Sequence, residues 1–600
     1  MKGTKHIYMK YYSKKQWTQK LTIMVFLAMA LGGTAVQAMP SGADIRSGQG
    51  SISQDGKNMT VQQNSQRMAI DWTKFDIAKD ETVRYAQPDR NAISLNRVTG
   101  GQQSVIAGNL NANGNVVLVN PNGVVFTKNS SVDVGGLVAS TARLNDEAMK
   151  NFSNGKDSLG LSLDKDSTAS VINEGQIKAQ GGLVALHAAN VENKGTITNE
   201  GGTLAMAATK NLTLSAADDD KLNFTVDGEL AKSQALNSGS LKAAGGYVVM
   251  TAKSAGDVLS TVVNNTGTIE AKTLRKNEKG QILLDGGDNG QVEVSGTLDA
   301  SGTEEGQSAG NIKVIGEKTI VHDGTNLLAR GAIDGGKIET SGDVLNLGDN
   351  LNIDAKGVNG KAGEWLLDPL EVLIQDEQPI QAAGDQSLPT VNEGKETQIT
   401  YNDPPSATQN ADATYSSTTW IKTSKITDIL KAGTDVTIQA ASTSQAASIT
   451  VNSAIKPKVE KDREATLTLE AQRNITINKE IKADANGGKL NVKLNSDTDG
   501  DGVGAVIINA DISTNGGTFT SGSGGNVKFT APSGTKAGAY AATGIEKDTK
   551  PNIAGHTVGT YFGYVVPEGQ SAIELSGEKI IGTSLPMAVL LHWMEKSPSA

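Results

Sequence analysis

Several residue types on which other classes of protein depend are absent or scarce in this 600-residue chain. It contains no cysteine, so no disulfide can lock its loops. Aromatic residues make up only 4%, which argues against a large globular core, because such cores use the large buried area of aromatic side chains. No segment reaches the ~18 apolar residues of a membrane helix, so we expect no transmembrane anchor in the mature chain.

Catalytic and nucleic-acid-binding patterns are also missing. The chain has five histidines at isolated positions, and it has no nucleophile elbow, phosphate-binding loop or zinc signature. The net charge is −10, with both signs scattered along the chain, which argues against a nucleic-acid partner. We therefore expect a protein that is not an enzyme and holds no organic cofactor.

Glycine, asparagine, aspartate, serine and threonine are abundant instead, and they recur in a repeat. The segment beginning at Asn173 aligns with the one beginning at Asn237, a shift of 64 residues, and a related turn starts at Asn193. The 20 residues from Asn173 to Asn193 are about one turn of a parallel β-helix. Short alternating strands between asparagine–glycine turns favour an all-β fold of stacked coils.

We predict a right-handed parallel β-helix, a solenoid with an amino-terminal cap, a polar linker and a second β-helical segment. Ile177, Val184 and Ile197 are expected to point inward, and asparagines at equivalent corners could form hydrogen-bonded ladders. Residues 39–110 are expected to cap the first coil. For the aromatic residues Trp72, Phe75 and Trp365, core packing is favoured over contact with a partner.

Compositional breaks suggest the domain limits. Six lysines precede the apolar segment Leu21–Leu31, and small residues follow up to Ala38, as in a secretory signal peptide cleaved after residue 38. We expect the domains at 1–38 (signal peptide), 39–290 (amino-terminal β-helix domain), 291–374 (β-helix continuation), 375–417 (polar linker or insertion), 418–545 (second β-helical segment, with a short helix at 426–432) and 546–600 (irregular tail).

Three motifs stand close together near the amino terminus. Asn120-Pro121-Asn122-Gly123 lies between two short β-branched runs and has the residue order of a type I turn. Upstream are Ile70-Asp71-Trp72 and the triplet Asn96-Arg97-Val98, and Gly363–Pro369 forms a later segment.

In these motifs the chain resembles the filamentous-haemagglutinin-like exoproteins of two-partner secretion. The resemblance implies a secretion domain at 39–290, recognised by the POTRA domains of a cognate outer-membrane β-barrel transporter. It implies export through the periplasm of a Gram-negative-type bacterium, to the medium or the cell surface. It assigns the secretion motif to Asn96, Arg97, Val98, Asn120, Pro121, Asn122 and Gly123. The turn could present strand edges to the transporter or keep the region folded, and the second role is favoured.

The function expected from this resemblance is an adhesin that binds a receptor on a host-cell or bacterial surface. The alternatives are a haemolysin, the stalk of a contact-dependent inhibition toxin, and a β-helical polysaccharide lyase. The lyase would need calcium ligands and a basic catalytic residue on one face, and no such cluster stands out.

One acidic turn could bind a metal ion. Asp497, Asp499 and Asp501 alternate before a glycine, like the first half of an EF-hand calcium loop. The twelfth position, which should be glutamate, is Ile508, so the ligand set is incomplete. An ordinary acidic turn is expected, with Ca²⁺ binding as the alternative.

Overall fold

A computed structural model of the chain describes residues 39–153, 155, 158–216, 222–255, 261–276, 278–377, 418–441, 447–501, 504–510 and 512–521, and then 526–529, 537–542, 562–567, 573–576 and 579–582. The expected signal peptide, residues 1–38, and residues 378–417 of the expected linker lie outside this part. Within the expected tail, 546–600, three short strands are described.

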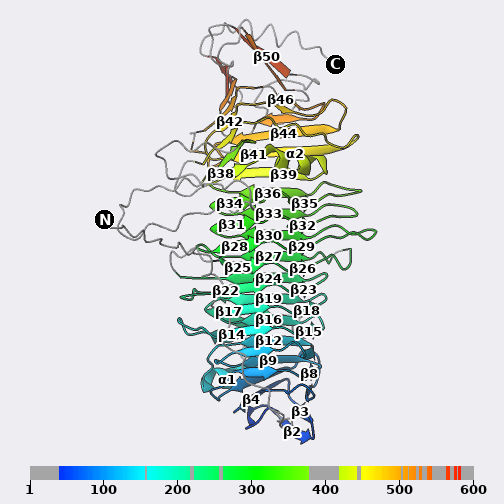
Figure 1. Ribbon diagram of the computed structural model, residues 1–600, viewed down its shortest axis with the longest axis vertical. Helices are drawn as coiled ribbons and strands as arrows, with labels where there is room; N and C mark the ends of the chain where they lie inside the picture. The colour runs from blue at the N-terminus through cyan, green and yellow to red at the C-terminus, as the bar shows by residue number, and fades with distance from the viewer. Residues whose placement is uncertain are drawn as a thin grey trace, which may run out of the picture.

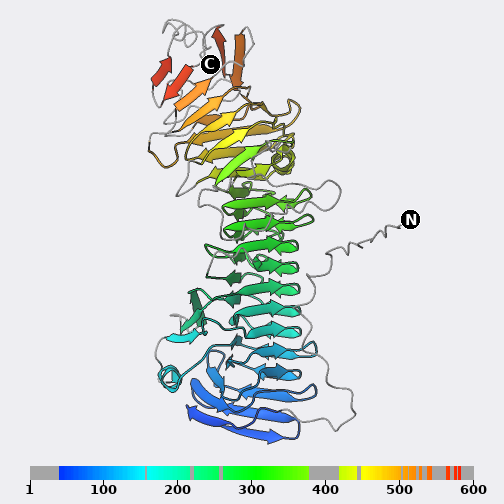
Figure 2. The same ribbon diagram turned by 60° about the vertical axis from the view of Figure 1, so that its left-hand side comes forward.

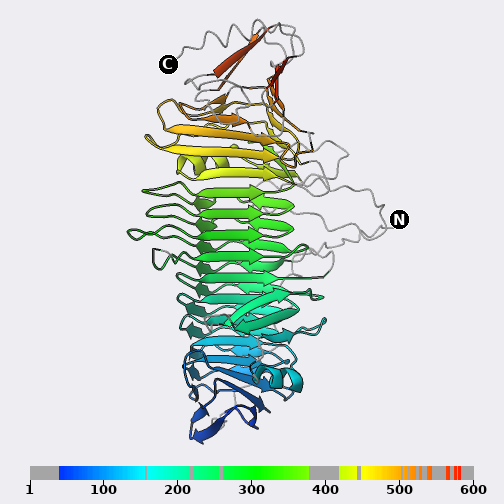
Figure 3. The ribbon, with the colours of Figure 1, turned by 180° about the vertical axis from the view of Figure 1, so that it is seen from behind.

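The described chain winds into an elongated parallel β-helix, which confirms the predicted fold class (Figure 1). Three sheets run along the rod, and each coil adds one strand to each sheet over most of its length (Figures 1 and 3). At a strand spacing of about 4.8 Å, sixteen stacked strands extend over roughly 70 Å. Every pair in these three sheets is parallel except β1–β4 and β2–β3 at the amino-terminal end.

The strands of the three sheets follow in order along the rod. The 16-stranded sheet contains β1 Asp44–Ser47, β4 Arg67–Trp72, β6 Ile93–Val98, β9 Asn115–Val119, β12 Gly136–Ser140, β16 Leu183–His187, β19 Thr203–Ala208, β24 Tyr247–Ala252, β27 Gln281–Asp285, β30 Asn311–Ile315, β33 Lys337–Ser341, β36 Glu364–Asp368, β39 Asp435–Ala440, β41 Glu464–Ala471, β44 Lys489–Ser496 and β47 Phe519–Ser521. The 12-stranded sheet contains β2 Gly50–Asp55, β3 Asn58–Gln63, β5 Thr82–Ala86, β8 Asn109–Ala112, β11 Ser131–Val134, β15 Gln176–Ala179, β18 Thr196–Asn199, β23 Ser240–Lys242, β26 Thr268–Glu270, β29 Thr297–Asp299, β32 Asn326–Leu328 and β35 Asn352–Asp354. The 9-stranded sheet contains β7 Ser104–Ile106, β10 Val124–Phe126, β14 Ser170–Asn173, β17 Asn190–Asn193, β22 Gln234–Asn237, β25 Thr261–Asn265, β28 Gln291–Val294, β31 Lys318–Val321 and β34 Val344–Leu347.

The remaining elements lie outside these sheets or near the carboxyl end of the rod. An 8-stranded sheet contains β38 Thr418–Ile421, β37 Glu371–Ile374, β40 Ile449–Val451, β42 Ile475–Ile477, β45 Ala505–Ile508, β48 Asn526–Phe529, β51 Ile573–Ser576 and β52 Lys579–Gly582. Two strand pairs are β43 Ile481–Lys482 with β46 Ile512–Ser513 and β49 Ala537–Ala542 with β50 Phe562–Pro567. A three-stranded sheet contains β13 Ser158–Ser162, β20 Asn211–Ala216 and β21 Leu222–Asp227, and the helices are α1 Asp146–Ser153 and α2 Thr423–Lys431.

Inward-facing apolar side chains form continuous columns inside the coils. Ile177, Ile197 and Leu241 stand in register on successive strands, and none is more than 2% exposed. One coil has no partner for its inner face, whereas stacked coils bury it and hydrogen-bond each strand on both sides. Trp72, Phe75 and Trp365 are also buried in this interior, as their core-packing interpretation predicted.

Four asparagines form the ladder that the repeat suggested. The Nδ2 of Asn173 donates to Oδ1 of Asn193 at 2.8 Å, Asn193 donates to Asn237 at 2.8 Å, and Asn237 donates to Asn265 at 2.7 Å. All four side chains are at most 1% exposed. Successive asparagines of the ladder are 20, 44 and 28 residues apart in the sequence. The first two spacings add up to 64, so the 64-residue repeat spans two coils. The second coil is longer because the chain leaves the β-helix there to form β20 and β21.

The amino-terminal cap is shorter than expected. Antiparallel pairing is confined to β1–β4 and β2–β3, whereas parallel coil stacking already begins with β3–β5 and β4–β6. Residues 39–110 therefore contain the first coils as well as the cap. The reason is that Trp72 and Phe75 fill the interior of these coils, where their rings make an edge-to-face contact at 5.4 Å.

Two features of the outer surface were not predicted, namely helix α1 and the three-stranded sheet. Both pack on the outer face of the 16-stranded sheet and bury a second apolar cluster there (Figures 2 and 3). Asn145 begins α1 by accepting a hydrogen bond from the backbone N–H of Ala148 at 2.8 Å, a helix-start signal present in the sequence. The predicted short helix at 426–432 corresponds to α2, which begins three residues earlier.

The two sides of the expected linker share one sheet. β36 pairs with β39, so the 16-stranded sheet continues from residue 368 to residue 435 without a break in its ladder. β37 and β38, which flank residues 378–417, also lie side by side in parallel. The coils after residue 418 therefore stack directly on those before it.

The buried ladder leads to a stability prediction. Asn237→Ala removes the acceptor of Asn193 and the donor to Asn265, so it should lower the free energy of unfolding by about 2 kcal/mol. Asn352→Ala is the matched control, because Asn352 also donates to an asparagine of the preceding coil, Asn326 at 2.8 Å, but is exposed. It should change stability by less than about 0.5 kcal/mol. Urea unfolding followed by circular dichroism measures both, and equal effects would contradict a role for the buried ladder.

Candidate functional site

The amino-terminal motifs lie on neighbouring strands of the first coils. β4 and β6 pair in parallel, which places Ile70 beside Asn96, Asp71 beside Arg97 and Trp72 beside Val98. The tetrapeptide 120–123 connects β9, which pairs with β6, to β10. The structure thus brings together all seven predicted secretion-motif residues, and Val98 fills the interior with 4% exposure.

Asn96 points into the core and organises two aromatic side chains. Its Oδ1 accepts hydrogen bonds from Nε1 of Trp72 at 3.0 Å and from the hydroxyl of Tyr85 at 2.8 Å. Its Nδ2 donates to the backbone carbonyl of Ser94 at 3.1 Å. Burial raises the pKa of Tyr85, so the hydroxyl keeps its proton and remains a donor. Asn96 therefore provides a hydrogen-bond acceptor for the buried Nε1 of Trp72 and the buried hydroxyl of Tyr85.

Arg97 points the other way, to the outer face, and joins three parts of the chain. Its Nε and Nη2 each donate at 2.7 Å to the two oxygens of Asp71, a bidentate pair. It also donates to the backbone carbonyl of Leu144 at 3.0 Å and to Asp146, in the first turn of α1, at 2.7 Å. The hydrogen bonds that Arg97 donates to Asp71 are the main cause that raises the pKa of Arg97. Arg97 thus fixes α1 to the outer face of the first coils.

The tetrapeptide 120–123 is a hydrogen-bonded turn, as predicted. The backbone N–H of Gly123 donates to the carbonyl of Asn120 at 3.0 Å. The Oδ1 of Asn120 accepts from the N–H of Asn122 at 3.0 Å, and its Nδ2 donates to Gln102 and Ser104 at 3.0 Å each. Gly123 has a φ of +117°, which favours glycine there.

The turn and the upstream triplet are connected. Nδ2 of Asn122 donates to the carbonyl of Gly100 at 2.9 Å, and Gly100 follows the triplet by two residues. A side chain at residue 100 would meet the backbone carbonyl of Thr73, so the chain after β6 lies close to the chain after β4. We call Asp71, Trp72, Asn96, Arg97, Asn120 and Asn122 the motif cluster. Most of its polar atoms are used in holding four chain segments together.

The strands beside the turn have no open edge for a partner strand. β9 pairs with β6 and β12, and β10 pairs with β7 and β14. A strand from another protein could pair only after one of these pairs had opened. Of the two roles considered for the turn, the geometry therefore supports that of keeping the region folded.

Sequence reasoning missed the residues that complete the cluster. Asp71 was recognised within a motif but not as the partner of Arg97, and Tyr85 and Ser104 were not singled out. Asp71 and Arg97 are 26 residues apart, close to the length of one coil, and that spacing was the available signal.

A buried histidine lies beneath the outer layer. Ser140 Oγ is 2.9 Å from Nδ1 of His187, and Nε2 of His187 is 3.0 Å from the carbonyl oxygen of Thr209. Because a carbonyl can only accept, Nε2 carries the proton and Nδ1 accepts from Ser140. Burial lowers the pKa of His187 to about 4, so the ring is neutral in the folded protein. It thereby joins the β-helix to the residues that lead into β20.

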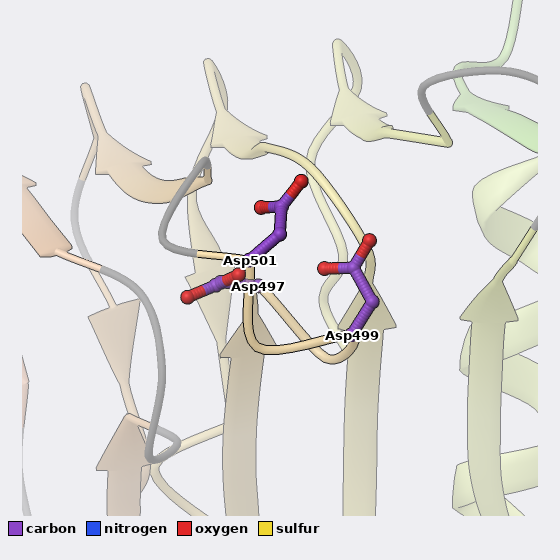
Figure 4. A group of neighbouring side chains, drawn as sticks. All are labelled: Asp497, Asp499 and Asp501. Atoms are coloured by element: carbon purple, nitrogen blue, oxygen red, sulfur yellow. The ribbon is translucent and has the colours of Figure 1, made fainter.

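The three candidate metal ligands do come together. Asp497, Asp499 and Asp501 extend from one loop after β44, with ligand oxygens within 4.8 Å of one another (Figure 4). Arg473 forms an ion pair with Asp501 at 2.6 Å, which offsets part of the negative charge. Ile508, at the position where an EF-hand has its bidentate glutamate, is 1% exposed in the core. Calcium binding remains a prediction. The three carboxylates alone do not make up the ligand set of an EF-hand loop.

Comparison with known proteins identifies the class of domain to which the first coils belong. The family model of the TPS secretion domain matches residues 36–314. The secretion domain of HMW1 from Haemophilus influenzae has a similar structure, with a TM-score of 0.50 and 20% identity over 73% of this chain and 98% of that one. The chain therefore carries a two-partner secretion domain on a parallel β-helix.

Two curated relatives extend this comparison. Both are heme/hemopexin-binding proteins of Haemophilus influenzae, one 30% identical over 288 residues and the other 33% identical over 284. The matches cover 47% and 43% of this chain but only 31% and 30% of those proteins. The matched part of this chain spans less than a third of the length of these relatives.

The motif cluster yields a second prediction. Asn120→Ala removes both Nδ2 bonds and the acceptor of the Asn122 N–H at a side chain that is 0% exposed, so stability should fall by about 2–3 kcal/mol. Asn122→Ala, in the same turn but exposed, should cost less than about 1 kcal/mol. Thermal unfolding by circular dichroism compares the two. A smaller loss for Asn120→Ala than for Asn122→Ala would show that the turn is not held by Asn120.

The buried histidine yields a prediction for pH. The unfolded chain binds a proton at His187 near pH 6.5, whereas the folded chain does so only near pH 4. Stability is therefore lost as the pH falls from 6.5 to 4, by about 3 kcal/mol in total. Asp368 and Asp435 have pKa values raised to about 6 by burial, and they act in the opposite direction.

A comparison of wild type with His187→Gln separates the contribution of the histidine to the pH dependence of stability from that of those carboxylates. The variant should lose less stability than wild type between pH 6.5 and 4, measured by urea unfolding at each pH. Parallel pH profiles would contradict a neutral buried His187.

Proposed function

We propose that the chain is a secreted or cell-surface adhesin of a Gram-negative-type bacterium. Its amino-terminal domain, residues 39 to about 290, acts as the signal read by the POTRA domains of a cognate outer-membrane transporter. The observation that carries this proposal is the secretion-domain match at residues 36–314, which contains the whole motif cluster. The coils beyond it extend the rod and offer surface for a receptor on another cell.

In this proposal the motif residues 96–98 and 120–123 keep the first coils folded, which gives the later coils a defined surface on which to stack. Among the described residues, neither helix is long and apolar enough to cross a bilayer.

The energy for crossing the outer membrane comes from folding on the far side. Each coil that forms outside buries its inner face against the previous one, so backward movement of the chain would require unfolding. No nucleotide hydrolysis is needed for such a step. Export should therefore depend on the inward column of the early coils.

This dependence can be tested by co-expression with the transporter, scored by protein in the medium and on the cell surface. Replacing Ile177, Val184 and Ile197 together by aspartate should leave the chain in the periplasm, because all three are at most 2% exposed. The control replaces Gln176, Lys178 and Thr198, which alternate with the inward residues on β15 and β18, by aspartate and should be exported. Normal export of the inward variant would refute folding-driven export, and wild-type export without the transporter would refute the two-partner route.

A second candidate is binding of haem or hemopexin, which is favoured by the names of the two curated relatives. Purified protein assayed for retention on haemin-agarose and on immobilised hemopexin, beside attachment to host or bacterial cells, separates this candidate from the adhesin. The haemolysin, toxin-stalk and lyase alternatives have no feature of the described residues in their favour.

A further inference from the structure

A column of amide side chains lies along one corner of the rod, beside the 8-stranded sheet. The residues directly after β37, β40, β42 and β45 are Gln375, Asn452, Asn478 and Asn509. Nδ2 of Asn509 donates to Oδ1 of Asn478 at 2.8 Å, and Nδ2 of Asn478 donates to Oδ1 of Asn452 at 2.9 Å. Nδ2 of Asn452 donates to Oε1 of Gln375 at 3.3 Å. We call these four residues the outer amide ladder.

The outer amide ladder has unused hydrogen-bonding groups, unlike the buried ladder that begins at Asn173. In the buried ladder, three asparagines donate a second N–H to the carbonyl of the glycine two residues further on. The three asparagines of the outer amide ladder are exposed or half-buried, and each Nδ2 has one acceptor within the described part of the chain. An asparagine side chain offers two N–H donors and two acceptor lone pairs. Each of these amides therefore keeps a donor and an acceptor for a ligand.

Trp420 lies on the outer face of the same sheet, at one end of the ladder. It is on β38, where it stands beside Leu373 of β37, on the side of the rod labelled β38 and β42 in Figure 1. Its Nε1 donates to the backbone carbonyl of Gln375 at 2.8 Å, and Nζ of Lys422 lies 5.4 Å from the centre of a ring of the indole. These contacts hold the half-buried indole in one orientation.

The partial exposure of Trp420 is unusual in this chain. Of the aromatic side chains whose burial the structure describes, all are buried except Phe224, Tyr247 and Trp420. Phe224 and Tyr247 pack against the apolar cluster on the outer face of the 16-stranded sheet, whereas Trp420 belongs to neither apolar cluster. A fixed aromatic ring on a polar surface is a platform for the apolar face of a ligand.

The surface beside the ladder is uncharged. The outward residues Leu373, Thr450, Thr476 and Ile507 stand in register on successive strands of the sheet, and all four are half-buried. Neither this column nor the outer amide ladder contains an ionisable side chain, although 20% of the residues of the chain are charged. The two columns therefore form a neutral strip across four coils, which favours a neutral ligand over an ionic one.

The spacing of the strip matches an extended sugar chain. Equivalent residues of successive coils repeat at the strand spacing of ~4.8 Å. An extended β-linked hexose chain advances by nearly the same distance per sugar, so one sugar faces each coil. A sugar hydroxyl both donates and accepts hydrogen bonds, as does the free part of each amide. The C–H face of a sugar ring is apolar and stacks on an indole.

We propose that the outer amide ladder and Trp420 bind a neutral, extended β-linked oligosaccharide, with one sugar for each coil. This inference rests on the proposed function, because it names the chemistry of the receptor that the adhesin binds. One sugar stacks on Trp420, and the following sugars exchange hydrogen bonds with Asn452, Asn478 and Asn509. The bonds within the ladder fix the amides in advance, so binding costs little side-chain freedom.

Isothermal titration calorimetry of the purified exported chain tests this proposal with four hexasaccharides. Cellohexaose and chitohexaose are neutral and extended, maltohexaose is neutral but coiled, and a heparin hexasaccharide is strongly anionic. We expect at least one of the two extended neutral probes to bind at least tenfold more tightly than maltohexaose and the heparin probe. Failure of both extended neutral probes to bind would overturn the proposal. So would binding of maltohexaose or the heparin probe that is as tight or tighter.

Substitutions test whether the sugar binds at this surface. Trp420→Ala should weaken binding tenfold or more, whereas Trp420→Phe keeps an aromatic ring and should retain most of it. Asn478→Ala interrupts the ladder and should weaken binding at least threefold. Asn352→Ala is the matched control, because Asn352 is an exposed asparagine bonded across coils to Asn326, but on the 12-stranded sheet. It should leave binding unchanged.

Circular dichroism shows which variants are folded, and only folded variants are compared. Unchanged binding by a folded Trp420→Ala or Asn478→Ala chain would overturn the proposal, and so would an equal loss in Asn352→Ala.

Attachment of cells that carry the exported chain separates this inference from the proposed function. If such cells attach to other cells but neither extended neutral probe binds the chain, the adhesin stands and only its ligand class is wrong. If the cells attach no better than cells without the chain, or if export does not require the transporter, the proposed function itself has failed.

Discussion

In-register stacking of successive coils is the constraint on which the rest of this molecule depends. Each strand of the three long sheets, apart from those at the ends, is hydrogen-bonded on both sides, and the inward side chains stand in register with those one coil away. No coil can bury its inner face alone, so the stability of any coil comes from its neighbours. A polar residue inside the stack must therefore be bonded within it. The ladder from Asn173 to Asn265 and the bonds of Asn96 both satisfy this requirement.

The first coils need contacts beyond coil stacking, because they have no preceding coil on which to stack. Antiparallel strands β1 and β2 close the end, and Arg97 ties β4, β6 and α1 together on the outside. Asn120 and Asn122 fix the chain between β9 and β10 to the segment that follows β6. These bonds of the motif cluster thus give the first coils one conformation.

Much of the coil architecture was predictable from local patterns. Short alternating strands, asparagine–glycine turns and the 20-residue spacing indicated the β-helix, and the 64-residue shift pointed to equivalent corners. The turn at 120–123 was predictable because proline, asparagine and glycine each have a fixed conformational preference. These signals are strong because each repeats the same local requirement along the chain.

The outer layer and the contacts of the motif cluster were not predictable in the same way. β13 is separated from its partner β20 by about two coils of chain. No local pattern in Ser158–Ser162 predicts that it pairs with β20. The pairing of Asp71 with Arg97 depends on the length of one coil, which varies from 20 to 44 residues in the ladder region.

Native-state hydrogen exchange of the exported protein tests the central claim most directly, namely that the motif cluster holds the first coils in one conformation. If that is so, the backbone amides of β4, β6 and β9 exchange among the slowest in the chain, together with those of the ladder strands β14, β17 and β22. Exchange in β4, β6 and β9 as fast as in the exposed turns between strands would contradict it.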